Sequence, residues 1–332
     1  MKLLLGFCLT LILMLTACTS TESRKRVAQW EQWKQPNGKV KILSTTAMIN
    51  EIVRQVGGEH VDALVLIHGE LDPHSYQMVK GDDEKFLFAD LVFYNGLGLE
   101  HSPNMRHFLE TAPKAIGLGE RLRQQYPDCI LYYEGQLDPH IWMDVSLWAK
   151  TITFVVEGLS AHDPVHAKNY ANNGEILYQQ FMNQHTRIKS MIGNVPENKR
   201  YLVTSHDAFY YFTLAYLAPE DEKLHDAWRK RFAAPEGLSP ESQLSAMDIQ
   251  LLVDHLVEYR IEVVFPETNV SHDSLRKIVH AANEKGLKVG IANAALYADA
   301  LGKPGSEGET YLKMILYNAH TIQRFLNQET VP

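Results

Sequence analysis

Residues 40–67, VKILSTTAMINEIVRQVGGEHVDALVLI, contain the pattern that decides the fold. The apolar segment 40–43 is typical of a short β-strand, and 47–56 carries apolar residues at the three- and four-residue spacing of a helix. A Gly-Gly pair at 57–58 ends that helix, and a second strand is predicted at 61–67. Because a helical crossover joins parallel strands, this stretch predicts a β-α-β unit.

The alternation of strand and helix continues along the chain. A helix is predicted to end at 86–89, a strand follows at 91–94, and 116–118 continues the series. The rhythm begins again after Gly193, with strands at 201–205, 262–265 and 288–291 and helices at 207–217, 247–257, 271–285 and 310–326. The expected fold class is therefore α/β with parallel sheets.

A long helical stretch separates the two series. It is predicted to run from Asp163 to about Ile192, because Asp163 suits the N-cap and Pro164 the first turn, with Gly174 as its one weak point. We therefore expect two parallel-sheet α/β lobes joined by one long backbone helix. Open sheets of this kind bind ligands beyond the carboxyl ends of their strands, so the cleft between the lobes is the expected site.

The N-terminus has the composition of an export signal. Lys2 precedes an apolar run at 3–15, which is shorter than the roughly 20 residues of a membrane span. The run ends in Leu15-Thr16-Ala17-Cys18, which resembles a bacterial lipobox with cleavage before Cys18 and acylation of its thiol. An ordinary signal peptide that happens to contain a cysteine is the alternative.

These features predict the domain boundaries. The expected order is a signal peptide at 1–17, a lipid-attached tether at 18–39, an N-terminal lobe at 40–160, a linking helix at 161–195 and a C-terminal lobe at 196–332. A chain of 332 residues is long enough for two such lobes. Trp30 and Trp33 in the tether suggest a short helix or a membrane-surface contact.

Composition narrows the class of partner. The net charge is −8, so no basic surface indicates a nucleic acid partner. Of the three cysteines, Cys8 would leave with the signal and Cys18 would be acylated. Cys129 is then alone, and no intrachain disulfide is expected.

Two copies of one motif suggest a functional role. Leu71-Asp72-Pro73-His74 recurs as Leu137-Asp138-Pro139-His140, and both copies lie in predicted loops. Proline restricts the backbone and aspartate can hydrogen-bond the turn, so each histidine is held on a rigid support. A rigid support suits a metal ligand. A structural role for both histidines remains the alternative.

Two further candidates follow predicted strands. His206, in Thr204-Ser205-His206-Asp207, lies where the strand at 201–205 ends and faces the expected cleft, although its neighbours could simply cap a helix. Asp299 follows the last strand and precedes the glycine-rich segment 302–308, where a turn residue is the ordinary interpretation.

Other tempting features are set aside. His162 and His166 have the spacing of metal ligands on a helix, but a solvated helix face explains them better. The sequence contains no H-E-x-x-H helix, C-x-x-C pair, P-loop or G-x-S-x-G elbow. Segment 95–100, NGLGLE, lacks the third glycine and the acidic signature of a dinucleotide loop.

Four blocks together carry a resemblance to a known family. LDPHSYQMVKGDDEKFLFADLVFYNGLGLE, LDPHIWMD, TSHDAFYYF and LYADALGKPGSEGETY occur in this order, and the sequence resembles the metal-specific solute-binding proteins of ABC importers, the TroA-like family, especially its chlamydial lipoproteins. The resemblance extends from Val40 to the C-terminus. It implies two α/β lobes, a long joining helix and one ion between the lobes, bound by His74, His140, His206 and Asp299.

The implied ligands limit the choice of metal. Three imidazoles and one carboxylate suit Zn, Fe(II) or Mn(II) and leave no open position for a reacting water. No His-rich loop of the kind found in some zinc-specific members lies between His74 and His140. Manganese-specific members usually have Glu at the position of His206. Glu267 is a candidate outer partner of the ligands, with a plain loop carboxylate as the alternative.

The sequence therefore predicts an exported, lipid-anchored, monomeric receptor in the periplasm or on the cell surface. It would capture one divalent transition-metal ion (Zn, Mn or Fe) and deliver it to the permease subunits and ATPase of an ABC importer. The expected protein is not an enzyme and has no nucleic acid partner. The rival interpretations are a metal-dependent hydrolase, which would need an open coordination position, and a surface adhesin lipoprotein, which would not need all four ligands.

Overall fold

The structure is a computed structural model that describes residues 27–224, 226–235, 237 and 245–327. The predicted signal peptide, Cys18 and the first residues of the predicted tether lie outside the described residues. Cys129 is exposed and is a free thiol, as expected. Within the described part of the chain, none of the helices has both the length and the apolar composition needed to cross a membrane.

The first half of the chain forms a parallel sheet with the strand order β2-β1-β3-β4. Its strands are β1 (Val40–Ser44), β2 (Val61–Val65), β3 (Leu91–Tyr94) and β4 (Ala115–Gly117). The helices between and after them are α2 (Ala47–Gly57), α3 (Asp82–Phe88), α4 (Pro103–Thr111) and α5 (Leu118–Gln125). This confirms the β-α-β unit that the opening stretch predicts.

Helix α2 shows how the local sequence sets this arrangement. The side chain of Thr46 caps its N-terminus, and the helix buries Met48, Ile49, Ile52, Val53 and Val56 on the face towards the core. The helix ends at Gly57, and Gly58 follows with a positive φ of 55° that suits glycine. A β-carbon on Gly57 would lie 2.4 Å from Val61, so the pair also lets the chain return tightly into β2.

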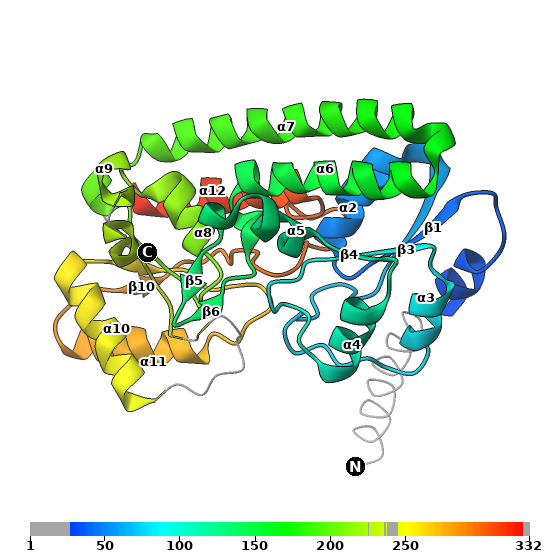
Figure 1. Cartoon of the computed structure of the whole chain (residues 1–332). Coiled ribbons are helices and arrows are strands. Elements are labelled where there is room, and N and C mark those ends of the chain that lie inside the picture. Colours follow the sequence, from blue (N-terminus) through cyan, green and yellow to red (C-terminus); the bar gives the residue numbers. More distant parts are fainter. Residues whose placement is uncertain (1–26, 225, 236, 238–244, 328–332) are drawn as a thin grey trace, which may run out of the picture.

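Two antiparallel helices cover both halves of the molecule (Figure 1). They are α6 (Val145–His162) and the long α7 (Ala167–Gly193), joined by a 3-10 turn at Pro164–His166. Helix α7 contacts α2 from the first half and α12 from the second. A helix of this length spans about 40 Å, which agrees with the expected long backbone helix.

The predicted start of the long helical stretch is confirmed: Asp163 is the N-cap residue of the 3-10 turn Pro164–His166, Pro164 opens that turn, and α7 follows directly at Ala167. The carboxylate of Asp163 accepts a hydrogen bond from the Tyr170 hydroxyl (2.6 Å) and lies 2.7 Å from Nδ1 of His166. Helix α6 was not predicted, although Asp144 is a clear N-cap that accepts hydrogen bonds from the amides of Ser146 and Leu147.

Gly174 is required by the packing of these two helices. A β-carbon at this position would lie 2.5 Å from Cγ2 of Val156 on α6. Without a side chain here, α6 and α7 can approach closely. The residue that looked like a weak point in the helical pattern is therefore a contact point between two helices.

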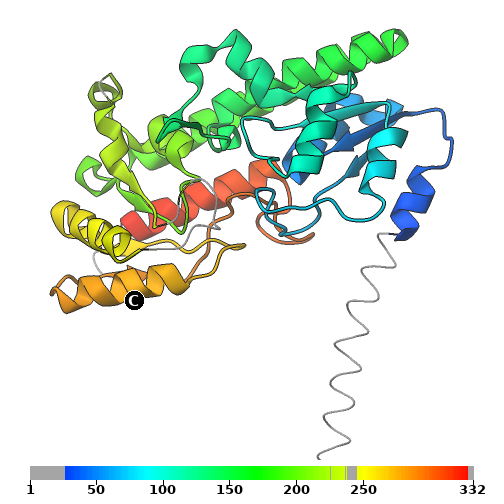
Figure 2. The same cartoon turned by 60° about the horizontal axis from the view of Figure 1, so that its bottom comes forward.

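The second half contains two pairs of parallel strands, β7 (Leu202–Val203) with β8 (Phe232–Ala233), and β9 (Val263–Val264) with β10 (Gly290–Ile291). A hydrogen bond of 2.8 Å from the amide of Phe265 to the carbonyl of Val203 links the two pairs. The main helices of this half are α10 (Ala246–Tyr259), α11 (Asp273–Glu284) and α12 (Tyr311–Leu326). Helices α10 and α11 lie side by side (Figure 2).

Shorter elements complete the fold. The strands β5 (Tyr132–Tyr133) and β6 (Gln136–Leu137) form an antiparallel hairpin. The predicted helix at 207–217 is instead a short turn, α8 (Tyr210–Phe212), followed by a π-helix at Thr213–Leu217. The remaining short helices are α9 (Glu220–Lys223) and the 3-10 turns Gly58–His60, Pro127–Cys129, Ile141–Met143, Glu197–Lys199 and Ala227–Arg231.

Part of the predicted tether, which was expected to extend to residue 39, packs against the first half of the molecule. Residues 27–33 are helical, and Trp33 is only 3% exposed. Its indole Nε1 donates to the carbonyl of Asp62 (2.9 Å), and its ring packs on Phe88 with a centroid separation of 5.4 Å. The sequence analysis placed this segment outside the lobe because it is polar overall, whereas its two tryptophans attach it to the lobe.

Candidate metal centre

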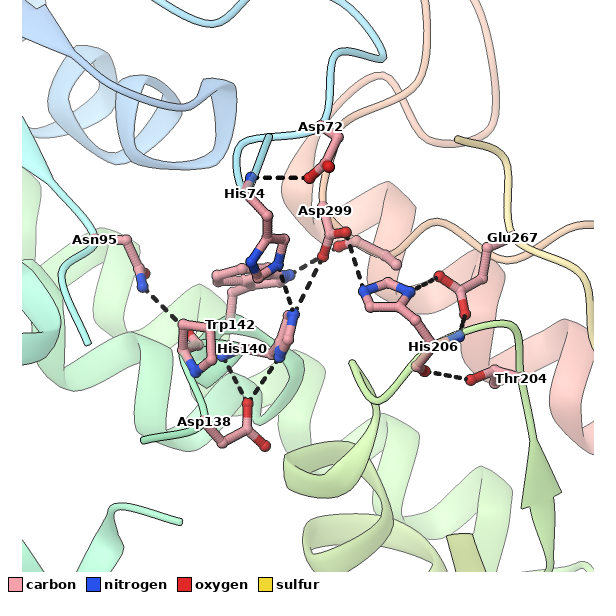
Figure 3. A network of polar contacts seen from close by, with 12 residues as sticks. Asp72, His74, Asn95, Asp138, His140, Trp142, Thr204, His206, Glu267 and Asp299 are labelled. Atoms are coloured by element: carbon pink, nitrogen blue, oxygen red, sulfur yellow. Dashed lines mark hydrogen bonds and ion pairs between the residues drawn. The ribbon is translucent and has the colours of Figure 1, made fainter. Parts of the chain in front are cut away.

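Four side chains from distant parts of the chain meet in the middle of the molecule (Figure 3). They are His74, His140, His206 and Asp299, and each offers one ligand atom within 4.8 Å of the other three. All four are buried, with at most 2% of their surface exposed. The four candidates that the sequence singled out are therefore brought together as one cluster.

Each member of the cluster is carried by a loop beside an element of the fold. His74 lies between β2 and α3, and His140 lies between β6 and the turn that precedes α6. His206 follows β7, and Asp299 lies between β10 and α12. Two side chains thus come from each half of the chain. Side chains in such loops converge where the two halves of an α/β structure face each other.

The two repeated motifs form the same local turn. Asp72 Oδ1 accepts a hydrogen bond from the amide of His74 at 2.8 Å, and Asp138 Oδ1 accepts one from the amide of His140 at 3.0 Å. Each aspartate thus holds the backbone of the histidine two residues later. This is the rigid support that the motif predicts.

The second motif also orients its imidazole. Asp138 Oδ1 lies 2.7 Å from Nδ1 of His140, which leaves Nε2 pointing into the cluster. The side-chain amide of Asn95 donates to the carbonyl of Pro139 at 3.0 Å, and the Tyr211 hydroxyl donates to the carbonyl of Asp138 at 3.2 Å. A carboxylate on the outer nitrogen of a histidine fixes the tautomer and raises the basicity of the inner nitrogen.

The loop of Asn95 is itself held by a buried carboxylate. Glu100 accepts hydrogen bonds from the Thr45 hydroxyl (2.6 Å) and from the amides of Asn95 (2.8 Å) and Gly96 (3.0 Å). Gly96 and Gly98 have positive φ values of 77° and 88°. Segment 95–100 is therefore a turn closed on Glu100, and its glycines serve the backbone conformation.

Glu267 contacts Nδ1 of His206, as Asp138 contacts Nδ1 of His140. Its Oε2 lies 2.5 Å from Nδ1 of His206, and its Oε1 accepts from the amides of Ser205 (2.8 Å) and His206 (3.0 Å). The residue is fully buried. The carboxylate thus lies where an outer partner of a metal-binding His206 would be placed.

Asp299 faces the imidazoles with both oxygens. Its Oδ2 lies 3.1 Å from Nε2 of His206, and its Oδ1 lies 3.5 Å from Nε2 of His140. Within the described residues neither oxygen accepts a conventional hydrogen bond. The preceding carbonyl, of Ala298, accepts from the indole Nε1 of Trp142 at 2.8 Å, which holds this loop against the turn that follows His140.

The charges of the cluster are strongly coupled. Burial, helped by the neighbouring imidazoles of His140 and His206, holds the pKa of His74 well below its ordinary value. Burial also opposes the charge on His206, but the carboxylates of Glu267 and Asp299 outweigh it and raise the pKa of His206 well above the ordinary value. Burial alone would raise the pKa of Asp299, yet the imidazoles, His206 first, lower it.

Three of the distances between donor atoms lie close to those of a metal site, and all four donors lie within 4.8 Å of one another. Metal–ligand bonds of about 2.0–2.2 Å in tetrahedral geometry place neighbouring donors about 3.3–3.6 Å apart. Here Nε2 of His74 and Nε2 of His140 are 3.2 Å apart, and the two separations from Asp299 are 3.1 and 3.5 Å. Two buried nitrogens facing each other can share one proton, and when that proton leaves, both lone pairs are available to an ion between them.

Other histidines stay outside the cluster. His162 is exposed, and His166 stacks on His60 with a ring separation of 3.8 Å. This agrees with the expectation that the pair is not a ligand set. His101 is exposed and its ring lies 6.4 Å from that of His74.

Sequence reasoning missed three residues that hold the site. Asp138 received only a turn role, and Asn95 and Trp142 were not considered. The Asp-x-His spacing was the available signal for Asp138, because a carboxylate two residues before a histidine can reach both its amide and its ring. Nothing in the local sequence marks Asn95 or Trp142, because their partners lie 44 and 156 residues away.

Comparison with known proteins gives a consistent picture. A protein-family model described as "ZnuA: Zinc-uptake complex component A periplasmic" matches residues 42–325. The chain is 42% identical to the "Metal-binding protein YtgA" of Chlamydia pneumoniae over 263 residues, which cover 79% of this chain and 80% of that protein. It is 31% identical to the "Manganese-binding lipoprotein MntA" of Bacillus subtilis, with 88% and 92% covered.

A solved structure has the same fold. The crystal structure of Fe(III)-bound YtgA from Chlamydia trachomatis superposes with a TM-score of 0.83 at 36% identity and covers 89% of this chain and all of that one. The descriptions of the family model and of these two relatives name zinc, manganese and iron, respectively. The expected α/β fold with parallel sheets is confirmed by this likeness.

Proposed function

Because the chain belongs to the family of periplasmic zinc-uptake components, we propose that it is the extracytoplasmic substrate-binding component of an ABC importer for a divalent transition metal. One ion is its cargo, bound by His74, His140, His206 and Asp299. The observation that carries the proposal is the buried cluster of three imidazoles and one carboxylate, whose donor atoms are spaced for a single ion.

Transport fits this cluster better than catalysis. A catalytic zinc site has three protein ligands and keeps a position open for water, whereas a site with four protein ligands is closed. Two nearby carboxylates, Asp138 and Glu267, are engaged with the outer nitrogens of ligand histidines and are not free to act as a base. The family consists of metal-binding transport proteins, so the hydrolase alternative has no support in the site or in the relatives.

The donor set admits zinc, manganese and iron. With a divalent ion and one ligand carboxylate, the four ligands and the ion carry a net charge of about +1. Glu267 and Asp138 lie directly behind two of the imidazoles and compensate this charge in the dry interior. We infer that they act as outer partners, which set the orientation of the ligands and do not bind the ion themselves.

The rest of the molecule is assigned as follows. The N-terminal lobe is placed at 40–160, the linking helix at 161–195 and the C-terminal lobe at 196–332, preceded by a signal peptide at 1–17. Cys18 is the proposed lipid attachment site, and related lipoproteins such as that of Bacillus subtilis support it. The protein acts as a monomer outside the cytoplasm, anchored to the membrane in which the permease and its ATPase work.

The decisive experiment measures metal stoichiometry and the stability that metal confers. Protein purified without added metal should contain, or take up, one transition-metal ion per chain. The ion should raise the thermal midpoint, because a ligand that binds only the folded state stabilises it; saturation at 100 times the dissociation constant contributes about 2.7 kcal/mol. His74→Ala and His140→Ala should abolish most of this shift while the apo protein remains folded.

A matched control is the double variant His162→Ala with His166→Ala. It also removes two imidazoles, but from outside the metal cluster: the exposed His162 at the end of α6 and the half-buried His166 in the turn before α7. Its metal-induced shift should equal that of the wild type. A normal shift in the His74 and His140 variants would place the metal elsewhere. Full surface function in these variants would favour the adhesin alternative, which does not need the ligands.

A further inference from the structure

Three exposed apolar side chains and the half-buried Trp30 lie on two adjacent elements of the N-terminal lobe and are called the patch here. The patch consists of Val27 and Trp30 in the helical segment 27–33 and Leu87 and Phe88 at the end of α3. Leu87 is 71% exposed, Val27 59% and Phe88 41%. The rings of Trp30 and Phe88 meet edge to face with centroids 5.9 Å apart, so the two elements form one surface. They lie side by side in both views of the molecule (Figures 1 and 2).

The aromatic rings of this patch are anchored from below. Trp33 lies under it, buried and hydrogen-bonded to Asp62, with its ring 5.6 Å from Trp30 and 5.4 Å from Phe88. The ammonium of Lys34 lies 5.0 Å above the ring of Trp30. The aromatic rings of the patch are therefore anchored in the lobe, and the ion pair of Lys34 with Glu31 (2.7 Å) lies at its edge. Exposed apolar patches of this kind mark interaction surfaces.

The distance to Cys18 limits what can cover the patch. Only eight residues, 19–26, separate Cys18 from Val27. Fully extended, the nine residue steps from Cys18 to Val27 reach about 32 Å, at roughly 3.5 Å per step. With an acyl chain on Cys18, the patch would stay within this distance of the bilayer. Soluble partners must diffuse to it, whereas the membrane is always present.

The chemistry of the connecting segment also favours a lipid surface. Arg24, Lys25 and Arg26 are consecutive cations directly before the patch. Consecutive cations next to a membrane anchor are attracted to anionic headgroups. Tryptophan prefers the boundary between headgroups and acyl chains, where its ring is apolar on its faces and its N–H remains hydrated. Leucine and phenylalanine add apolar area that can enter the same boundary.

We propose that the patch of Val27, Trp30, Leu87 and Phe88 docks on the anionic surface of the membrane that holds the lipid anchor. The inference rests on the proposed lipid attachment at Cys18. Docking gives the N-terminal lobe a fixed orientation on the bilayer, with α7 on the other side of the lobe (Figure 1). The acyl chain holds the protein at the membrane, and the patch determines the angle between the N-terminal lobe and the bilayer surface.

The first test uses tryptophan fluorescence of the complete lipidated protein in vesicles of phosphatidylglycerol and phosphatidylcholine. Vesicles whose acyl chains are brominated should quench Trp30. Trp142, Trp148 and Trp228 are at most 1% exposed and should be spared, whereas Trp33 is buried 5.6 Å from Trp30 and should be quenched less than Trp30. Trp30→Phe should therefore remove most of the quenched signal. Absence of quenching in the wild type, with the protein still anchored, would overturn the docking while the anchor stands.

The second test removes the anchor. The chain from Thr19 contains every described residue and lacks Cys18, so its binding to the same vesicles reports the patch alone. The double variant Leu87→Asp with Phe88→Asp should weaken partitioning about tenfold or more, because both apolar side chains leave the boundary. Ile176→Asp, at an equally exposed position (58%) on α7, should leave partitioning unchanged.

The outcomes of these experiments distinguish a failure of membrane docking from a failure of the proposed metal-binding function. If the native chain carries no acyl group, the vesicle result with the chain from Thr19 still decides the fate of the patch. Metal uptake should be equal in all these variants, because none touches the metal cluster. Equal vesicle partitioning of the wild type and the double variant would overturn the proposal. So would a concentration-dependent dimer that Leu87→Asp abolishes, because a second copy of the chain would then cover the patch.

Discussion

At the scale of the residue, the site depends on which nitrogen of each imidazole is free. Asp138 occupies Nδ1 of His140, and Glu267 occupies Nδ1 of His206, so both rings offer Nε2 to the centre. His74 also directs Nε2 towards His140. Two carboxylates that do not belong to the cluster thus preset its geometry. Preset ligands lose little entropy when an ion binds.

The first residue-scale prediction concerns metal preference. His206→Glu replaces a borderline nitrogen donor with carboxylate oxygens, which favour harder ions such as Mn(II). The ratio of zinc affinity to manganese affinity should fall, as measured by competition titration of wild type and variant at one pH. An unchanged or higher preference for zinc would exclude His206 as a ligand.

That substitution needs a matched partner. The carboxylate introduced by His206→Glu would stand beside Glu267, whose Oε2 lies 2.5 Å from the present Nδ1, and two buried carboxylates repel each other. The double variant His206→Glu with Glu267→Gln relieves this repulsion. It should recover part of the lost affinity for both metals and keep the shifted ratio, which separates donor chemistry from local charge.

A second residue-scale prediction concerns protons. Glu267 and Asp299 raise the pKa of His206, so in the metal-free protein this imidazole keeps a proton at pH 7. An ion needs the lone pair of Nε2, and binding should release about one proton. Apparent affinity should therefore increase as the pH rises from below 6.5 towards the raised pKa of His206, by up to about tenfold per unit.

Calorimetry in two buffers with different ionisation enthalpies counts the released protons. Of the two carboxylates that raise the pKa of His206, Glu267 has the larger effect, and Glu267→Gln removes its charge. Fewer protons should therefore be released at pH 7. An identical binding enthalpy in both buffers would mean that no proton leaves. His206 would then be either neutral before binding or not a ligand.

At the scale of the element, the contact between α6 and α7 is unusually close. Gly174 should not tolerate alanine, because the added β-carbon would approach Val156 to 2.5 Å. Helix propensity alone would favour alanine by about 1 kcal/mol, whereas overpacking costs about 1–3 kcal/mol. We expect Gly174→Ala to lower the free energy of unfolding in denaturant titration.

Two controls test the cause of that loss. Gly193→Ala lies at the end of the same helix with open space around it, and it should not destabilise the protein. Adding Val156→Ala to Gly174→Ala removes the obstructing methyl groups, so the double variant should be less destabilised than the sum of the single changes. Additive effects would show that α6 and α7 do not meet at this point.

At the scale of the whole molecule, buried contacts join the two lobes on the side of the metal site. Trp142 donates to the carbonyl of Ala298, and the hydroxyl of Tyr311 donates to the carbonyl of Trp142 at 2.7 Å. The amide of Tyr311 donates to Glu51 at 2.6 Å, which joins the start of α12 to α2. Together with α7, these contacts resist rotation of one lobe against the other.

Loading with metal should therefore change the shape of the protein very little. Charge and geometry change at His206 and Asp299, and local loop movement absorbs the change. Scattering curves of the apo and loaded protein should nearly superimpose, with equal radii of gyration. A large decrease on loading would indicate a hinge motion that the long helix and the interlobe hydrogen bonds exclude. Tyr311→Phe removes one of these hydrogen bonds. Any difference in radius of gyration between the apo and loaded protein should be larger in this variant than in the wild type.

Much of the fold and of the candidate cluster could be predicted from the sequence alone. The β-α-β rhythm at 40–67 depends on local periodicity and on a glycine pair, and it appears in the structure almost unchanged. The Asp-Pro-His loops were equally visible, because each aspartate acts on a backbone amide two residues away. Local interactions of this kind are readable from order and spacing.

The tertiary structure alone decided what depends on distant partners. Gly174 proved to be a contact point of α7 with α6, because a β-carbon there would lie 2.5 Å from Val156. Trp33 joined the lobe because the carbonyl of Asp62 and the ring of Phe88 were available to it. Glu267 became the partner of His206 across 61 residues of sequence. In each case the deciding contact forms only when the chain folds, so a local sequence pattern cannot predict it.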